Sequence, residues 1–139
     1  MNLDFFNDFS DSYLKTNEGK GVFLAGVVLG MVAKGQVQKS GGKIEDSPLF
    51  KQLNFGKMSL KDLKRHLSRV PDLLKAYDIN YSEFIKALLA QVGEYLFKSP
   101  SKELGVDGNF TFALAFLNCS DYFWGKIFPK REVEENVQQ

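Results

Sequence analysis

The feature that most constrains the fold is a continuous apolar run near the N-terminus. Residues 21–33 are 13 consecutive uncharged residues, and the apolar pattern extends to about residue 38. The many β-branched side chains make a strand and a helix compete for this segment. About 17 residues exceed the length of a typical strand, so we expect a helix over residues 22–38. Because this helix is apolar on nearly every side, it should lie at the centre of the fold.

The sequence predicts a cytoplasmic protein without membrane contact. The uncharged run is shorter than the roughly 20 residues that a membrane-spanning helix needs. The first nine residues are acidic and aromatic, which is unlike a signal peptide. A single cysteine, Cys119, leaves no intrachain disulfide and no thiolate zinc site, in keeping with a reducing compartment.

The remaining segments also read as helices. The 139-residue length fits one domain, and no segment alternates long enough to indicate a strand. Ser59 and Asp62 have the spacing of a capping box, Pro71 predicts a kink or restart, and Ser82 is placed to cap the next helix. The expected helices cover residues 4–14, 22–38, 48–53, 59–77, 82–98 and 110–128. We therefore predict an all-α, single-domain helical bundle of four main helices plus one or two short helices, over residues 1–128. Residues 129–139 should form a polar, flexible tail.

The spacing of apolar residues within these segments predicts the core. Eight side chains at helical 3–4 spacing are expected to be buried: Val28, Met31, Leu63, Leu67, Leu88, Leu89, Phe112 and Phe116. Gly26 and Gly30 form a GxxxG pattern, which predicts a tight helix–helix crossing in the core or packing against a second copy. Residues 18–21 (EGKG) resemble a phosphate loop only vaguely, so we interpret them as a flexible connector.

No catalytic constellation can be assembled from the sequence. His66 is the single histidine, and the HExxH, GxSxG and CxxC motifs are absent. We therefore expect a protein that is not an enzyme and that needs no cofactor and no metal.

Cationic residues gather on one side of the predicted helix 59–77. Five of them fall within an arc of about 140° at 100° per residue, while the leucines occupy a separate arc of about 80°. Such a row can follow a phosphate backbone, although an ordinary solvated helix face has the same composition. The candidate nucleic-acid-binding residues are Lys57, Lys61, Lys64, Arg65 and Arg69, with Lys34, Lys39, Lys43 and Lys51 as a second group.

The order of motifs resembles a known family. Residues 22–30 (VFLAGVVLG), 47–55 (SPLFKQLNF), 60–65 (LKDLKR) and 74–78 (LKAYD), followed by a final helical pair, resemble the C-terminal helical domain of the large subunit of subtype I-B CRISPR Cascade complexes. In such systems this domain is also made as a free small subunit, and a chain that begins with Met1 just before the domain fits that form.

The resemblance implies a role without catalysis. Small subunits help to hold target or displaced-strand DNA in an R-loop, and they contact the large subunit, the backbone subunits and a second copy. The guide RNA complex and the target DNA are therefore expected partners, with sequence read by guide pairing. Two alternatives stay open: the small subunit of a subtype I-D complex, and a helical protein-interaction adaptor that does not touch nucleic acid.

Overall fold

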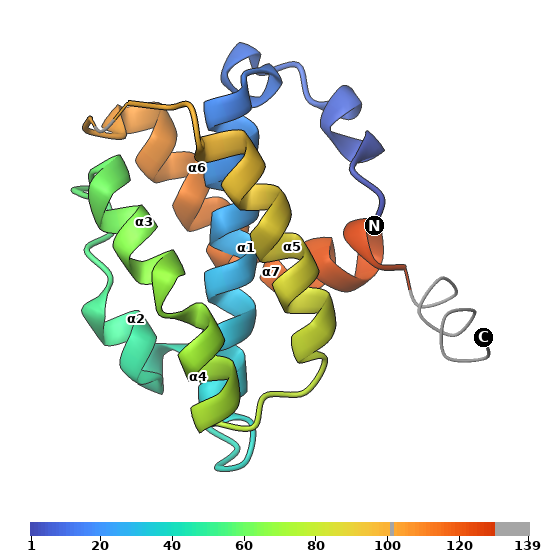
Figure 1. Cartoon of the computed structure of the whole chain (residues 1–139), viewed down its shortest axis with the longest axis vertical. Helices are drawn as coiled ribbons and strands as arrows, with labels where there is room; N and C mark the ends of the chain where they lie inside the picture. Colours follow the sequence, from blue (N-terminus) through green and yellow to red (C-terminus); the bar gives the residue numbers. More distant parts are fainter. Residues whose placement is uncertain (101, 130–139) are drawn as a thin grey trace.

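The chain folds around one central helix, α1 (Asn17–Val37), as expected from its apolar sequence (Figure 1). A computed structural model describes residues 1–100 and 102–129. Within these residues every regular element is helical, apart from an isolated antiparallel bridge between Ser59 and Glu103, so the all-α prediction is confirmed. The predicted tail falls outside the described residues except for Pro129.

The start of α1 was predicted wrongly. The helix begins at Asn17, five residues before the expected Val22, because Thr16 caps it. The Thr16 hydroxyl accepts a hydrogen bond from the Gly19 N–H at 2.9 Å and donates one to the Tyr13 carbonyl at 2.6 Å. Residues 18–21 are therefore the first turn of α1, and a Cβ on Gly19 would collide with the Tyr13 carbonyl oxygen.

The GxxxG pattern marks a close crossing, as predicted. Helix α6 (Gly105–Leu117) and the start of α7 (Cys119–Tyr122) lie against Gly26 and Gly30. A Cβ on Gly26 would lie 2.7 Å from the Phe112 carbonyl oxygen, and one on Gly30 would lie 2.6 Å from the Cys119 Cβ. The absence of side chains at these two positions lets the helix backbones approach.

On another side of α1 lie α2 (Pro48–Gln52), α3 (Leu60–Ser68) and α4 (Val70–Ala76). Ser47 caps α2 through its hydroxyl, which accepts from the Phe50 N–H at 3.1 Å. The predicted break at Pro71 is confirmed: α3 ends at Ser68, and Pro71 stands in the first turn of α4. A proline fits there because the first N–H groups of a helix have no partner within it.

Helix α5 (Ser82–Leu96) packs along α1 and begins at the predicted residue, but Ser82 does not cap it. The N-cap residue is Tyr81, which has a left-handed φ of 60°, and no side chain caps the helix. The last predicted helix begins earlier, at Gly105, and breaks at Asn118 between α6 and α7. A π-helical turn, η4 (Phe123–Ile127), ends it, with the Phe128 N–H donating to the Phe123 carbonyl at 2.8 Å.

The N-terminal segment forms two short 3-10 helices instead of the expected single helix over residues 4–14. These are η1 (Asp4–Asp8) and η2 (Ser12–Lys15), and a third such turn, η3 (Ile44–Asp46), precedes α2. Rings of η1 and the following residue pack on α1 and α7, in a cluster formed by Phe5, Phe6, Phe9, Phe23 and Tyr122.

Six of the eight predicted core side chains are buried. Met31 and Leu89 are half-buried, because each lines a surface depression. Among the described residues, α1 is the one helix whose length and apolar composition would allow it to cross a membrane. In this fold, however, 78% of its most apolar 18-residue window is buried. Packing against α5 and α6 accounts for its apolar composition.

Candidate nucleic-acid interface

The helix that carries the cationic residues, α3, begins at a complete capping box. The Ser59 hydroxyl accepts from the Asp62 N–H, and the Asp62 carboxylate accepts from the Ser59 N–H, both at 3.1 Å. These hydrogen bonds, together with the charges of Arg65 and His66, lower the pKa of Asp62. The carboxylate is therefore ionised at neutral pH and fixes the first turn of α3.

The start of α3 is also attached to the start of α6. The Leu60 N–H donates to the Lys102 carbonyl at 2.7 Å, and the Met58 N–H donates to the Asn109 carboxamide oxygen at 3.1 Å. The Leu104 N–H donates back to the Met58 carbonyl at 3.3 Å. These bonds join segments that are more than 40 residues apart, and they hold α3 in a defined position.

Four of the five predicted cations are exposed, and we call this set the basic face: Lys57, Lys61, Arg65 and Arg69. Arg65 makes an ion pair with Asp62 at 3.4 Å. Lys57, Lys61 and Arg69 make no ion pair and no side-chain hydrogen bond within the described part of the chain. Their charges are therefore available to an external anion.

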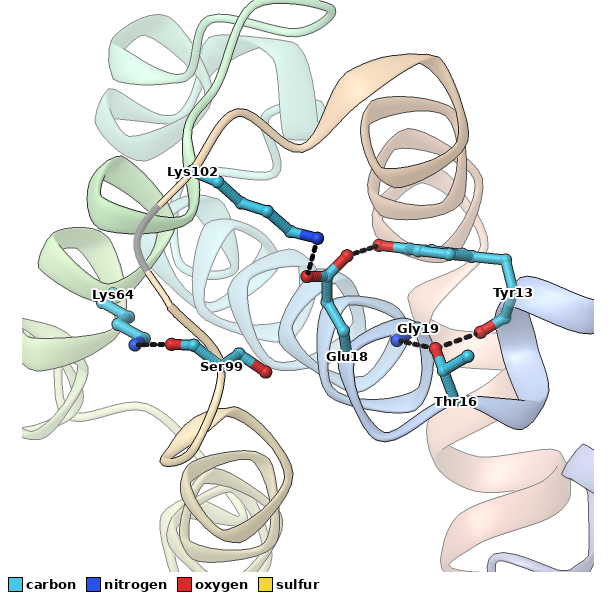
Figure 2. Close-up of polar contacts among 7 residues, drawn as sticks. All are labelled: Tyr13, Thr16, Glu18, Gly19, Lys64, Ser99 and Lys102. Carbon is cyan, nitrogen blue, oxygen red and sulfur yellow. Dashed lines mark hydrogen bonds and ion pairs between the residues drawn. The ribbon is translucent and has the colours of Figure 1, made fainter.

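Lys64 has a different position from the other four. It is half-buried, and its Nζ donates to the Ser99 carbonyl at 3.2 Å in the loop between α5 and α6 (Figure 2). The same loop is held farther along by an ion pair of Lys102 with Glu18, at 3.1 Å. Lys64 thus has a structural contact that the spacing along α3 did not reveal.

Glu18 links this loop to the N-terminal segment. Its second carboxylate oxygen accepts from the Tyr13 hydroxyl at 3.2 Å (Figure 2). Burial and the Glu18 carboxylate raise the pKa of the Tyr13 phenol, so the hydroxyl keeps its proton and remains a donor. Glu18, the first residue of the EGKG segment, therefore has a structural role through its ion pair with Lys102.

The second group of predicted cations is dispersed over other elements. Lys34, on α1, donates to the Ser120 hydroxyl at 2.6 Å, and the exposed Lys39 lies 3.9 Å from the Asp78 carboxylate. Lys43 and Lys51 are exposed, on the loop before η3 and on α2. These four lysines therefore lie on elements other than α3 and are not part of the basic face.

The sequence interpretation missed an exposed apolar stripe on α6. Val106, Phe110, Leu114 and Leu117 are 87%, 67%, 40% and 58% exposed, and their spacing of four, four and three residues places them on one side of the helix. We call this set the α6 face. Phe110 and Leu117 belong to an apolar pattern that covers the whole circumference of α6, but only one side of the helix can face α1. The apolar pattern around the whole of α6 was therefore the sequence signal for an exposed apolar stripe.

The charged residues nearest to the α6 face in the sequence are acidic. Between Lys102 and Lys126 the sequence contains Glu103, Asp107 and Asp121 and no lysine or arginine. All three acids are exposed. A polyanion is therefore disfavoured there, whereas a protein surface is a suitable partner for a contiguous apolar patch.

His66 is a buried side chain of α3. Burial, with the charges of Arg65 and Arg69, lowers its pKa, and Asp62 opposes this only in part. A folded-state pKa below the unfolded value of about 6.5 means that the unfolded chain binds more protons. The stability contribution of neutral His66 is therefore present above pH 6.5 and is lost as the pH falls through the folded-state pKa.

We expect the free energy of unfolding to decrease between pH 7.5 and 5.5. This range lies above the titration of Asp62, so His66 should dominate the change. Urea denaturation at the two pH values measures it, and a His66→Gln variant should show a smaller decrease. An equal decrease in the variant would show that another group is responsible.

No group of three or more His, Cys, Asp or Glu side chains suited to a metal ion occurs among residues 1–100 and 102–129. The Cys119 thiol is buried against Gly30, and burial raises its pKa.

A comparison with known protein families shows which family the chain belongs to. The model of the C-terminal domain of CRISPR-associated protein TM1802 matches residues 2–126. The chain therefore belongs to this family of CRISPR-associated proteins. No curated protein and no solved structure matches the chain. The predicted link to CRISPR is confirmed, while the subtype and the role as a small subunit stay predictions.

Proposed function

We propose that the chain is a non-catalytic subunit of a subtype I-B Cascade complex, in which it helps to hold target or displaced-strand DNA in the R-loop. The observation that carries the proposal is the presence, in a CRISPR-associated domain, of three exposed cations on and next to α3: Lys57 in the turn before the helix, Lys61 in its first turn and Arg69 at its C-cap. None of the three has an ion-pair or side-chain hydrogen-bond partner among the described residues. Such cations neutralise phosphates and release counterions, without reading bases. Sequence selection is then left to guide pairing in the cytoplasm.

In this proposal the α6 face contacts a protein subunit of the same complex. An exposed apolar stripe of this kind is typical of protein interfaces. The acids near the α6 face favour a partner surface that carries lysine and arginine at its rim, whereas DNA phosphates favour the basic face at α3. The large subunit, the backbone subunits and a second copy are the candidate partners.

The basic face is tested with the Lys57→Ala/Lys61→Ala/Arg69→Ala variant. Each lost phosphate contact should flatten the slope of log affinity against log salt by about 0.7 to 0.9. We therefore expect a slope that is flatter by about 2 to 3, with similar losses for unrelated DNA sequences. Fluorescence anisotropy at several salt concentrations, with the isolated chain and with the assembled complex, gives both values.

A control variant has the same charge change elsewhere. Lys15→Ala/Lys86→Ala/Lys126→Ala removes three exposed lysines from η2, α5 and η4. It should leave the affinity within about twofold and the slope nearly unchanged. If both variants alter binding equally, the effect is one of net charge, and the basic face is only a solvated surface.

A further inference from the structure

An apolar groove opens between α3–α4 and α5. It encloses about 400 Å³, and its single charged lining residue is Lys64. At Gly93 a Cβ would have no atom within 4 Å, so the groove is open above this residue. The remaining lining side chains are Leu67, Ser68, Pro71, Leu89, Val92, Leu96 and Phe97.

Phe97 stands at one end of this groove, directly after α5. Its side chain is 83% exposed and, within the described part of the chain, contacts no other aromatic ring, although most phenylalanines lie in ring clusters. A phenyl ring has only two rotatable side-chain bonds, so it offers a flat apolar surface at low entropic cost. In this position the ring is free to stack on a flat partner.

The charges near the groove are mainly positive. Lys64 lines it and is held in place by the Ser99 carbonyl (Figure 2). Lys61 lies one turn away on α3, and Lys98 follows Phe97 in the chain. Glu94, one turn before Phe97, is the acidic side chain of this end of α5. The groove thus lies beside the basic face.

We infer that this groove accepts an unpaired base of a single-stranded nucleic acid, which stacks on Phe97 while its phosphates follow the basic face. The inference rests on the proposed function and narrows its substrate. Bases in a duplex already stack on one another and present only their edges, whereas an unpaired base has a free face. Every base has such a face, so the contact discriminates single strands from duplexes without selecting sequence.

The test compares Phe97→Ala with wild-type full chain on two fluorescein-labelled probes: a 20-nucleotide oligo-dT strand and a 20-base-pair duplex. Loss of one stacking contact should weaken oligo-dT binding about 5- to 150-fold. The salt slope should stay unchanged because the ring carries no charge. Duplex binding should change less than twofold. Phe97→Trp, which keeps a stacking surface, should bind oligo-dT at least as tightly as wild type.

Phe110→Ala is the matched control, since it removes an exposed phenylalanine from the α6 face. It should leave oligo-dT binding unchanged, and circular dichroism should show all variants folded. If Phe97→Ala binds oligo-dT as wild type does while the basic-face variant loses affinity, stacking is overturned and the proposed function stands. If wild type shows no salt-dependent binding to either probe, the stacking inference and the proposed function are both overturned. If Phe97→Ala impairs only assembly with protein subunits, the groove holds a protein side chain and the inference is wrong.

Discussion

A Gly26→Ala/Gly30→Ala variant is expected to lose a large part of the stability of the protein. An added methyl group at Gly26 meets the Phe112 carbonyl at 2.7 Å, and one at Gly30 meets the Cys119 Cβ at 2.6 Å. The Phe112 carbonyl belongs to the backbone, and the Cys119 Cβ is fixed by the backbone, so neither can rotate away and α6 and α7 must move away from α1. Overpacking of this kind costs about 1 to 3 kcal/mol at each site, which exceeds the gain of up to about 1 kcal/mol in helix propensity. Urea denaturation with circular dichroism measures the loss.

Gly93→Ala is the control, because it should change the free energy of unfolding in the opposite direction. Gly93 also lies within a helix, but its added Cβ would meet no atom within 4 Å. Only the propensity effect remains, so we expect stabilisation by up to about 1 kcal/mol. If the double variant at α1 is as stable as wild type, the crossing of α1 and α6 is looser than described.

A Phe110→Ser/Leu117→Ser variant is expected to fold normally and to be lost from the CRISPR complex. Both side chains are more than half exposed, so little core packing is removed. Central apolar residues of an interface commonly contribute 2 kcal/mol or more, equivalent to about 30-fold in affinity. Co-purification with a tagged subunit of the complex, quantified against wild type, measures the loss.

The Phe110→Leu/Leu117→Met variant keeps the α6 face apolar at similar volume. It should co-purify nearly as wild type does, and both variants should retain the oligo-dT affinity of the isolated chain. Normal incorporation of the serine variant would assign the protein contacts to another surface.

The features predicted correctly from the sequence are those set by nearby residues. The central position of α1 follows from its apolar circumference, and the capping box at Ser59 requires only a neighbour three residues away. The restart at Pro71 follows from the missing N–H of proline. The GxxxG crossing was also predictable, because glycine spaced at one helical turn leaves a flat strip whatever the partner is.

The features that were missed depend on partners distant in the sequence. Lys64 has the spacing of a surface cation, yet it is held by the Ser99 carbonyl, 35 residues away. The start of α6 at Gly105 accompanies the backbone bonds of the preceding loop to Met58 and Leu60. The exposure of Phe110 depends on which side of α6 meets α1. Spacing within one helix predicts that Lys57, Lys61, Arg65 and Arg69 are exposed, but it does not tell which side of α6 meets α1 or where the groove opens.

The central position of α1 has a consequence for synthesis on the ribosome. The helix that covers its glycines, α6, begins about 70 residues after α1 ends. At a synthesis rate of about 5 to 20 residues per second, the residues between α1 and α6 take roughly 4 to 14 seconds to be made. During this interval its apolar surface is exposed to solvent, chaperones and neighbouring nascent chains. The protein therefore acquires its core only when the last third of the chain has emerged, and a message truncated before α6 yields an aggregation-prone product.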